Sequence, residues 1–158
     1  MKANVVSLDK RRKEIYSKWL NTFKWTHFIT LTTPYALSLN SARRLSERFY
    51  SKLKDHQYEP QLFWVAEKFE SKDGYHLHGL LKINKKTLPI HEYKFITNLY
   101  QICAGTSKCV KVDGELKYIN WSRIELAKYD KKRNGGGYCA KYVMAENNST
   151  NAEYDFLT

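Results

Sequence analysis

The sequence predicts an α+β fold: an antiparallel sheet of four to five strands, with flanking helices packed on one of its faces. Three observations support this prediction. The 158 residues suit one domain, 1–158, and a hydrophobic content of 42% is enough to build a core. Strand-like and helix-like segments follow one another in the order β-α-β-β-α-β-β-α. Asp-Gly dipeptides separate two pairs of strand-like segments, as in antiparallel hairpins.

The first three elements are predicted from their periodicity. Residues 1–24 are expected to hold a basic N-terminal helix, because apolar residues recur at helical spacing from residue 9 onward. Residues 28–33 are rich in β-branched side chains and are followed by Pro34, which favours a strand that ends there. Residues 41–54 carry apolar side chains at every fourth position, which predicts a helix.

A hairpin is predicted in the middle of the chain. Residues 62–69 and 75–83 have the composition of strands, and the turn between them, residues 71–74, ends in Asp-Gly. These two strands are therefore expected to pair. Residues 91–102 are expected to form the next helix.

The last third combines short elements with a glycine run. Strands are expected near residues 108–112 and 116–126, again separated by Asp-Gly. Residues 131–137, Lys-Lys-Arg-Asn-Gly-Gly-Gly, are expected to form a basic loop that allows close approach of a ligand or acts as a linker. Residues 138–146 are expected to be helical and residues 147–158 to form a loose C-terminal tail.

The composition predicts a polyanionic partner. Lysine and arginine total 27 against 16 acidic residues, a net charge of +11, with a pI near 9.5. This favours nucleic acid over an anionic membrane surface. No apolar run is long enough for a membrane span, and the first residues lack the apolar core of a signal peptide, so a cytoplasmic location is expected. The three cysteines form no CxxC pair and are expected to be reduced, with Cys139 in the core.

Two histidines, His76 and His78, are the first candidates for chemistry. On a strand they point to the same face, where two imidazoles can hold one metal ion. The preceding strand offers an acid, Glu67 or Glu70. These two acids lie on opposite faces, and the register that decides between them is open; Glu67 is favoured. Two imidazoles and a carboxylate suit Mg²⁺ or Mn²⁺, whereas the alternative is an ordinary strand with exposed histidines.

A late tyrosine motif is the second candidate. In a helix, Tyr138, Lys141 and Tyr142 share one face. A phenol becomes a useful nucleophile when a cation or a metal lies close to it, and Lys141 can supply such a charge. The alternative is an amphipathic helix whose tyrosines pack on the sheet.

Basic residues near both ends of the chain are candidates for DNA binding. Three lie in the predicted loop and two in the N-terminal helix, and such cations can follow a phosphate backbone. They are Lys131, Lys132, Arg133, Arg11 and Arg12. A run of charges can equally be a solvated surface.

Taken together, three motifs resemble those of the HUH endonucleases. Phe28-Ile29-Thr30-Leu31-Thr32 resembles their hydrophobic-Thr-Leu-Thr strand, His76-Leu77-His78-Gly79 their His-hydrophobic-His motif, and Tyr138-Cys139-Ala140-Lys141 their Tyr-x-x-Lys motif. The tyrosine follows the histidines, which resembles the rolling-circle replication initiators (Rep proteins) and not the relaxases. The resemblance implies an RRM-like or ferredoxin-like HUH endonuclease fold.

The resemblance also implies an activity, partners and a location. A Rep protein nicks single-stranded or hairpin origin DNA with Mg²⁺ or Mn²⁺. The implied metal ligands are His76, His78 and Glu67, and Tyr138 would form a 5′-phosphotyrosine link that leaves a free 3′-hydroxyl. Tyr142 resembles the second nucleophile of two-tyrosine initiators, but Ala145 stands where their second lysine is found. A host or accessory helicase and a polymerase would be partners. The location would be the host cytoplasm, or the nucleus of a eukaryotic host.

Three other functions fit parts of this pattern. A non-catalytic nucleic-acid-binding module would use the charge and the aromatic residues alone. A single-domain HUH transposase shares the metal motif and the tyrosine. A metal-dependent hydrolytic nuclease would cleave without a covalent intermediate.

Overall fold

A computed structural model describes residues 2–105, 109–118, 122–133, 135–143 and 154–158, with side chains except at 2–9, 109–110, 116–118 and 140–143. The helices are α1 (Lys2–Leu20), α2 (Leu39–Asp55), α3 (Ile90–Ala104) and α4 (Gly135–Val143), with a short 3-10 turn, η1 (Lys131–Arg133). The strands are β1 (His27–Thr32), β2 (Gln61–Lys68), β3 (Tyr75–Lys82), β4 (Cys109–Val112), β5 (Glu115–Tyr118), β6 (Arg123–Lys128) and β7 (Tyr154–Leu157).

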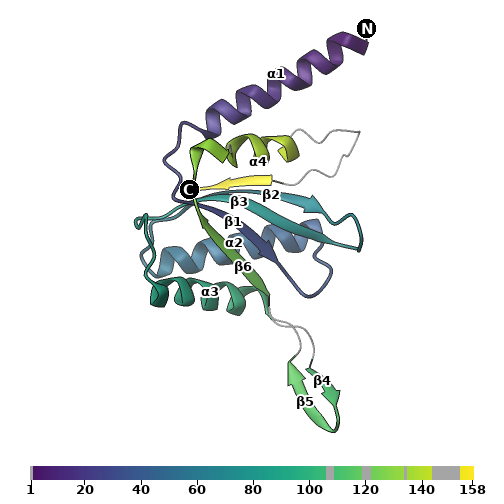
Figure 1. Cartoon of the computed structure of the whole chain (residues 1–158), viewed down its shortest axis with the longest axis vertical. Helices are drawn as coiled ribbons and strands as arrows, with labels where there is room; N and C mark the ends of the chain where they lie inside the picture. Colours follow the sequence, from purple (N-terminus) through teal and green to yellow (C-terminus); the bar gives the residue numbers. More distant parts are fainter. Residues whose placement is uncertain (1, 106–108, 119–121, 134, 144–153) are drawn as a thin grey trace.

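The predicted α+β class with an antiparallel sheet is confirmed. Five strands form one sheet in the order β6-β1-β3-β2-β7, and every neighbouring pair is antiparallel. Strands β4 and β5 form a separate hairpin that projects away from the sheet (Figure 1). The predicted pairing of the two central strands corresponds to β2 and β3.

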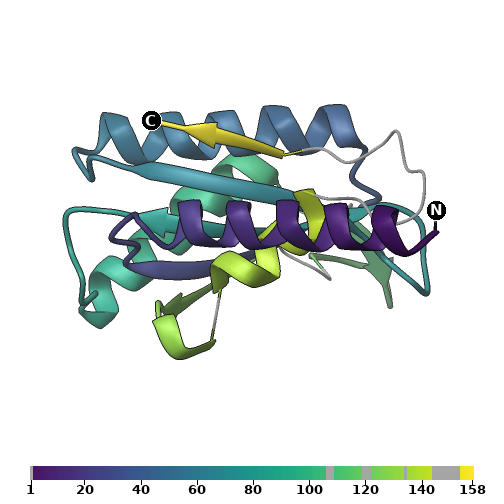
Figure 2. The same cartoon turned by 90° about the horizontal axis from the view of Figure 1, so that it is seen from above.

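Helices cover both faces of the sheet, so the prediction of helices on one face is wrong. Helices α2 and α3 lie on one side, and α4 lies on the other, with α1 across its outer surface (Figures 1 and 2). The reason is visible in β2, where four consecutive residues, Leu62 to Val65, are all buried. A strand that buries successive side chains needs a cover on each face.

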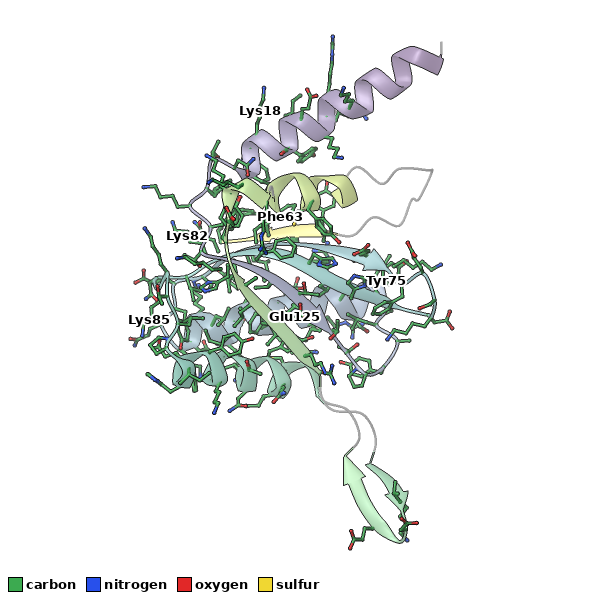
Figure 3. All side chains as sticks on the ribbon, viewed as in Figure 1. Lys18, Phe63, Tyr75, Lys82, Lys85 and Glu125 are labelled. Carbon is green, nitrogen blue, oxygen red and sulfur yellow. The ribbon has the colours of Figure 1, made fainter. Side chains whose placement is uncertain are left out.

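The sheet therefore has two hydrophobic cores. Leu62 and Trp64 face the core under α2 and α3, whereas Phe63 and Val65 face the core under α4 and the end of α1. Figure 3 shows Phe63 between the sheet and α4, and Lys18 on α1. Cys139 of α4 is fully buried in this second core, as the sequence predicted.

The turn between β2 and β3 is fixed by Gly74. Its φ of +96° is strained for any residue with a side chain. A Cβ atom at Gly74 would lie 2.8 Å from the backbone nitrogen of Leu37. The next residue, Tyr75, donates its backbone N–H to the Leu37 carbonyl at 3.0 Å. The hairpin is thus held against the loop that precedes α2.

Gly74→Ala should destabilise the domain far more than Gly114→Ala. Both glycines have a positive φ, but a Cβ at Gly114 would meet no atom within 4 Å. The matched control therefore carries only the backbone strain, about 1–2 kcal/mol. Gly74→Ala adds a steric clash with backbone atoms and should lower the free energy of unfolding by roughly a further 1–3 kcal/mol. Urea denaturation measures both values. Equal losses would show that contact with Leu37 does not hold the turn.

The glycine run belongs to a helix, so the prediction of a loop over residues 131–137 is wrong for its second half. Helix α4 begins at Gly135, three residues before the predicted start. A Cβ at Gly135 would lie 3.1 Å from side-chain atoms of Leu80 and Tyr129, and one at Gly136 would lie 2.7 Å from the Asn21 side-chain oxygen. The glycines let the helix backbone approach the sheet and the end of α1.

Three further boundaries differ from the predictions. The expected strand 116–126 corresponds to two strands: β5, which pairs with β4 in the separate hairpin, and β6, which pairs with β1 in the main sheet. The N-terminal helix ends at Leu20, before residue 24. Residues 154–157 are not loose but form β7 beside β2, where Asp155 pairs with Arg43 of α2 at 2.8 Å. The remaining parts of the predicted tail and final helix, residues 144–153, lie outside the described residues.

No described helix combines the length and the apolar character needed to cross a bilayer.

Candidate active site

The register of the central hairpin decides which acid faces the histidines. Strand β2 pairs with β3 so that Glu67 lies opposite His76 and Val65 opposite His78. Alternation along each strand then places Glu67 and both histidines on the face that α4 covers. Glu70 lies beyond the end of β2 and is exposed. Of the two candidate acids, Glu67 is the one that the fold brings to the histidines.

Glu67, His76 and His78 converge on one point. Oxygen Oε2 of Glu67 lies 2.8 Å from His76 Nε2 and 2.7 Å from His78 Nε2. One ligand atom from each of the three residues lies within 4.8 Å of the others. Two imidazole nitrogens and a carboxylate oxygen at this spacing fit a divalent transition ion. The imidazoles favour Mn²⁺ over Mg²⁺, because Mg²⁺ prefers oxygen ligands.

The protonation of His78 suits such a role. Burial lowers the pKa of His78 below its ordinary value, and the neighbouring His76 lowers it further, whereas Glu67 opposes both effects. The neutral imidazole is therefore favoured at neutral pH, and this is the form that binds a metal ion.

The two histidines are oriented in different ways. Nδ1 of His78 lies 3.3 Å from the hydroxyl of Thr30, its neighbour on β1. If Nε2 binds a cation, the proton resides on Nδ1 and Thr30 can accept it in a hydrogen bond. Nδ1 of His76 is buried and meets no hydrogen-bonding partner among the described residues. Its ring instead stacks on Phe69, with centroids 4.6 Å apart and planes at 31°.

Thr30→Val should weaken Mn²⁺ binding without unfolding the domain. Valine keeps the shape of threonine but removes the hydroxyl that orients His78. Loss of such a partner typically lowers metal affinity about 10- to 100-fold, and the long contact here suggests the lower end. Calorimetric titration of the DNA-free protein with Mn²⁺ measures the change. Thr32→Val, two residues along β1, is the matched control, since its hydroxyl bonds to the Arg123 carbonyl. Equal affinities in both variants would refute the orienting role.

The Tyr138 side chain extends from α4, which covers this face of the sheet, to the place where Glu67, His76 and His78 converge. Its hydroxyl donates a hydrogen bond to Glu67 Oε2 at 3.2 Å and lies 3.4 Å from His78 Nε2. Its ring meets the rings of His78 and Phe28 edge-on, at centroid distances of 5.0 and 5.8 Å. The side chain remains 38% exposed. The phenol thus contacts the carboxylate and one of the two imidazoles, and the carboxylate contacts both imidazoles.

The other predicted residues of the tyrosine motif are placed only in part. The backbone of Lys141 and Tyr142 continues α4 after Tyr138. Their side chains lie outside the part of the structure that is described. The prediction that all three share one face therefore remains a prediction.

The predicted DNA-binding cations fall into two groups. Lys131, Lys132 and Arg133 are exposed in η1, immediately before α4. Arg11 and Arg12 are exposed on α1, which lies across α4 and reaches the sheet only at its C-terminal end (Figure 1). Of the first group, Arg133 lines the same cavity as Tyr138.

Two residues near the site were not predicted as site residues. Thr30 entered the sequence analysis only as part of a strand motif. Glu125 of β6, labelled in Figure 3, lies opposite Thr30, and its charge raises the pKa of His78. Both are neighbours across strands, so their proximity to His78 depends on a register that sequence periodicity does not give.

Comparisons with known proteins give no relative from which a role can be taken. The chain matches no family model, and searches of curated proteins and of solved structures give no significant match.

Proposed function

We propose that this protein is a divalent-metal-dependent endonuclease that nicks single-stranded DNA through a covalent tyrosine intermediate. One observation carries the proposal: the Tyr138 hydroxyl touches both the carboxylate of Glu67 and the imidazole of His78. A tyrosine whose only role is to pack on the sheet would not require its hydroxyl to meet Glu67 and His78, two of the three proposed metal ligands. The position is also accessible to a substrate, because the side chain is 38% exposed.

The proposed step transfers a phosphoryl group from DNA to tyrosine. Oη of Tyr138 attacks the phosphorus, and the bond between phosphorus and the 3′ oxygen breaks. The phenol proton passes to Glu67, which accepts its hydrogen bond, or to solvent, and the departing 3′ oxygen takes up a proton. The products are a 5′-phosphotyrosine and a 3′-hydroxyl. Because no water is consumed, attack by a 3′-hydroxyl on the phosphotyrosine restores the phosphodiester.

The residues of the hairpin would support this step in two ways. A divalent ion held by Glu67, His76 and His78 would polarise the phosphate and stabilise its developing negative charge. With a cation bound, neutral His78 would carry its proton on Nδ1, beside Thr30, and its Nε2 lone pair would face the ion. The net charge of +11 favours a polyanionic substrate. The motif resemblance narrows the role to a replication initiator that acts on origin DNA with a separate helicase.

Covalent capture tests this function. The full chain is incubated with Mn²⁺ and a randomised single-stranded DNA pool labelled at the 3′ end, then denatured in SDS. The 3′ label should move with the protein, whereas a 5′ label should appear on a shorter strand, and EDTA should prevent both changes. Cleavage without a covalent product would indicate a hydrolytic nuclease. Salt-sensitive binding without cleavage would indicate a binding module.

Peptide mass spectrometry identifies the nucleophile in the same sample. Trypsin cuts after Arg133 and Lys141, so residues 134–141 form a peptide whose single tyrosine is Tyr138. Tyr142 falls in the following peptide. A nucleotide attached to residues 134–141 would support the proposal. The next peptide, residues 142–158, contains both Tyr142 and Tyr154, so a nucleotide found only there would exclude Tyr138, and its fragment ions would identify which of the two reacts.

A further inference from the structure

A cavity of about 350 Å³ opens directly beside Tyr138 and His78. It lies where β1 and the end of β6 meet the start of α4, and its wall includes Phe28, Tyr129 and Arg133. Small-molecule sites usually measure about 300–1,000 Å³, so this cavity has room for one small planar group. It is too small for a duplex or a folded partner.

The floor of the cavity is aromatic and tightly built. The rings of Phe28 and Tyr129 both pack closely against Gly135, since a Cβ there would lie 3.2 Å from Phe28 and 3.1 Å from Tyr129. The Tyr129 hydroxyl donates to the side-chain oxygen of Asn21 at 3.1 Å, which fixes the ring. Fixed aromatic rings at the edge of a basic surface are the usual stacking partners of unpaired bases.

The rim supplies both hydrogen-bond acceptors and donors. Asp130 and Arg133 are exposed at the cavity and belong to one turn, because the Arg133 backbone N–H bonds to the Asp130 carbonyl at 3.0 Å. Oδ1 of Asp130 accepts the backbone N–H of Lys132 at 2.9 Å, which orients the carboxylate. A carboxylate has lone pairs for more than one donor. A carboxylate acceptor and a forked guanidinium donor are the groups that proteins use to read base edges.

We propose that this cavity binds one nucleobase of the substrate, that of a nucleotide adjoining the phosphate that Tyr138 attacks. Asp130 accepts an N–H of the base, Arg133 donates to its ring nitrogen or carbonyl, and the aromatic floor packs against its face. The placement next to the cleaved phosphate rests on the proposed nicking function. The ability of the cavity to bind a base does not depend on that function. Base binding and its placement beside the cleaved phosphate are therefore tested separately.

Binding of free nucleotides tests the cavity without cleavage. The full chain in EDTA is titrated with the four deoxynucleoside 5′-monophosphates, and base-proton saturation transfer is followed by NMR. At least one nucleotide should bind, and 2-deoxyribose 5-phosphate, which lacks a base, should not. Arg133→Gln should weaken binding about 10-fold. Arg44→Gln, the same charge change on α2 across the sheet, should change it by less than about twofold.

Sequencing of captured DNA tests the placement. Among strands linked to the wild-type protein, one position next to the joined phosphate should show a base preference. Asp130→Asn replaces an acceptor with a mixed donor and acceptor, so the preferred base at that position alone should change. Asp113→Asn, in the distant β4–β5 turn, should leave every position unchanged. Thermal unfolding of each variant confirms that it is folded.

The outcomes separate this inference from the proposed function. Covalent products with identical base preferences in Asp130→Asn and wild type would overturn the inference while the nicking function stands. Absence of any covalent product would overturn the nicking function, and the nucleotide titration would still decide whether the cavity binds a base. Equal binding of nucleotides and sugar phosphate would overturn the inference directly.

Discussion

Tyr138→Phe is expected to abolish the covalent protein–DNA product while leaving DNA affinity nearly unchanged. The substitution removes one oxygen, which is the proposed nucleophile and the donor to Glu67. Loss of a nucleophile typically lowers the rate by roughly 10³-fold or more. The ring itself should stay in place, because its edge contacts with Phe28 and His78 need no hydroxyl. Binding should persist because the exposed cations that are expected to contact phosphate are unchanged.

The measurement pairs covalent capture with a binding titration of the same variant. Tyr142→Phe is the matched control, since it removes the same atom one helical turn further along α4. If Tyr138 acts alone, this control retains the covalent product. A Tyr138→Phe protein that still becomes linked to DNA, while Tyr142→Phe does not, would move the nucleophile to Tyr142.

His78→Ala is expected to remove both Mn²⁺ binding and Mn²⁺-dependent cleavage. His78 contacts Glu67, Thr30 and Tyr138, and so touches both the proposed ligands and the proposed nucleophile. The loss of Mn²⁺ affinity should exceed the roughly 10- to 100-fold effect of a missing outer partner, because a direct ligand is lost. Calorimetry with Mn²⁺ and covalent capture measure the two effects independently.

His76→Ala is a second ligand variant, needed because loss of the buried His78 side chain can itself destabilise the fold. His78 is buried, so its removal leaves a gap between the sheet and α4. The His76 side chain is 17% exposed and stacks on Phe69 near the end of the hairpin. Both variants should lose Mn²⁺ affinity. His91→Ala, an exposed histidine of α3, should keep it. Unchanged Mn²⁺ binding in a folded His76→Ala protein would contradict a shared metal site.

Local patterns predicted the central part of the fold well. The Asp73-Gly74 turn signal predicted the β2–β3 hairpin, and alternation separated the two candidate acids, Glu67 and Glu70, before the register brought Glu67 opposite His76. The predictions failed where tertiary contacts override local preference. Three glycines are poor helix formers in isolation, yet α4 needs residues without side chains to pack against Tyr129 and Asn21.

The C-terminal strand was missed for a related reason. Residues 154–157 are too few for periodicity to be informative, and β7 exists because β2 offers an open edge. The same limit applies to the site. The sequence supplied His76, His78, Tyr138 and two candidate acids, but their meeting point depends on the strand register and on the path of α4 over the sheet. Neither of these is a local property.

The order of the site along the chain has a consequence for its assembly during translation. Glu67 and both histidines belong to one hairpin, whereas Tyr138 follows His78 by 60 residues. The ribosome synthesises the chain from its N-terminus, and a domain generally folds as a unit. The three proposed ligands for the ion are therefore made well before the helix that brings the phenol. If the proposed function holds, a nascent chain stalled before α4 would contain the ligands but lack the nucleophile, and it would leave DNA uncut.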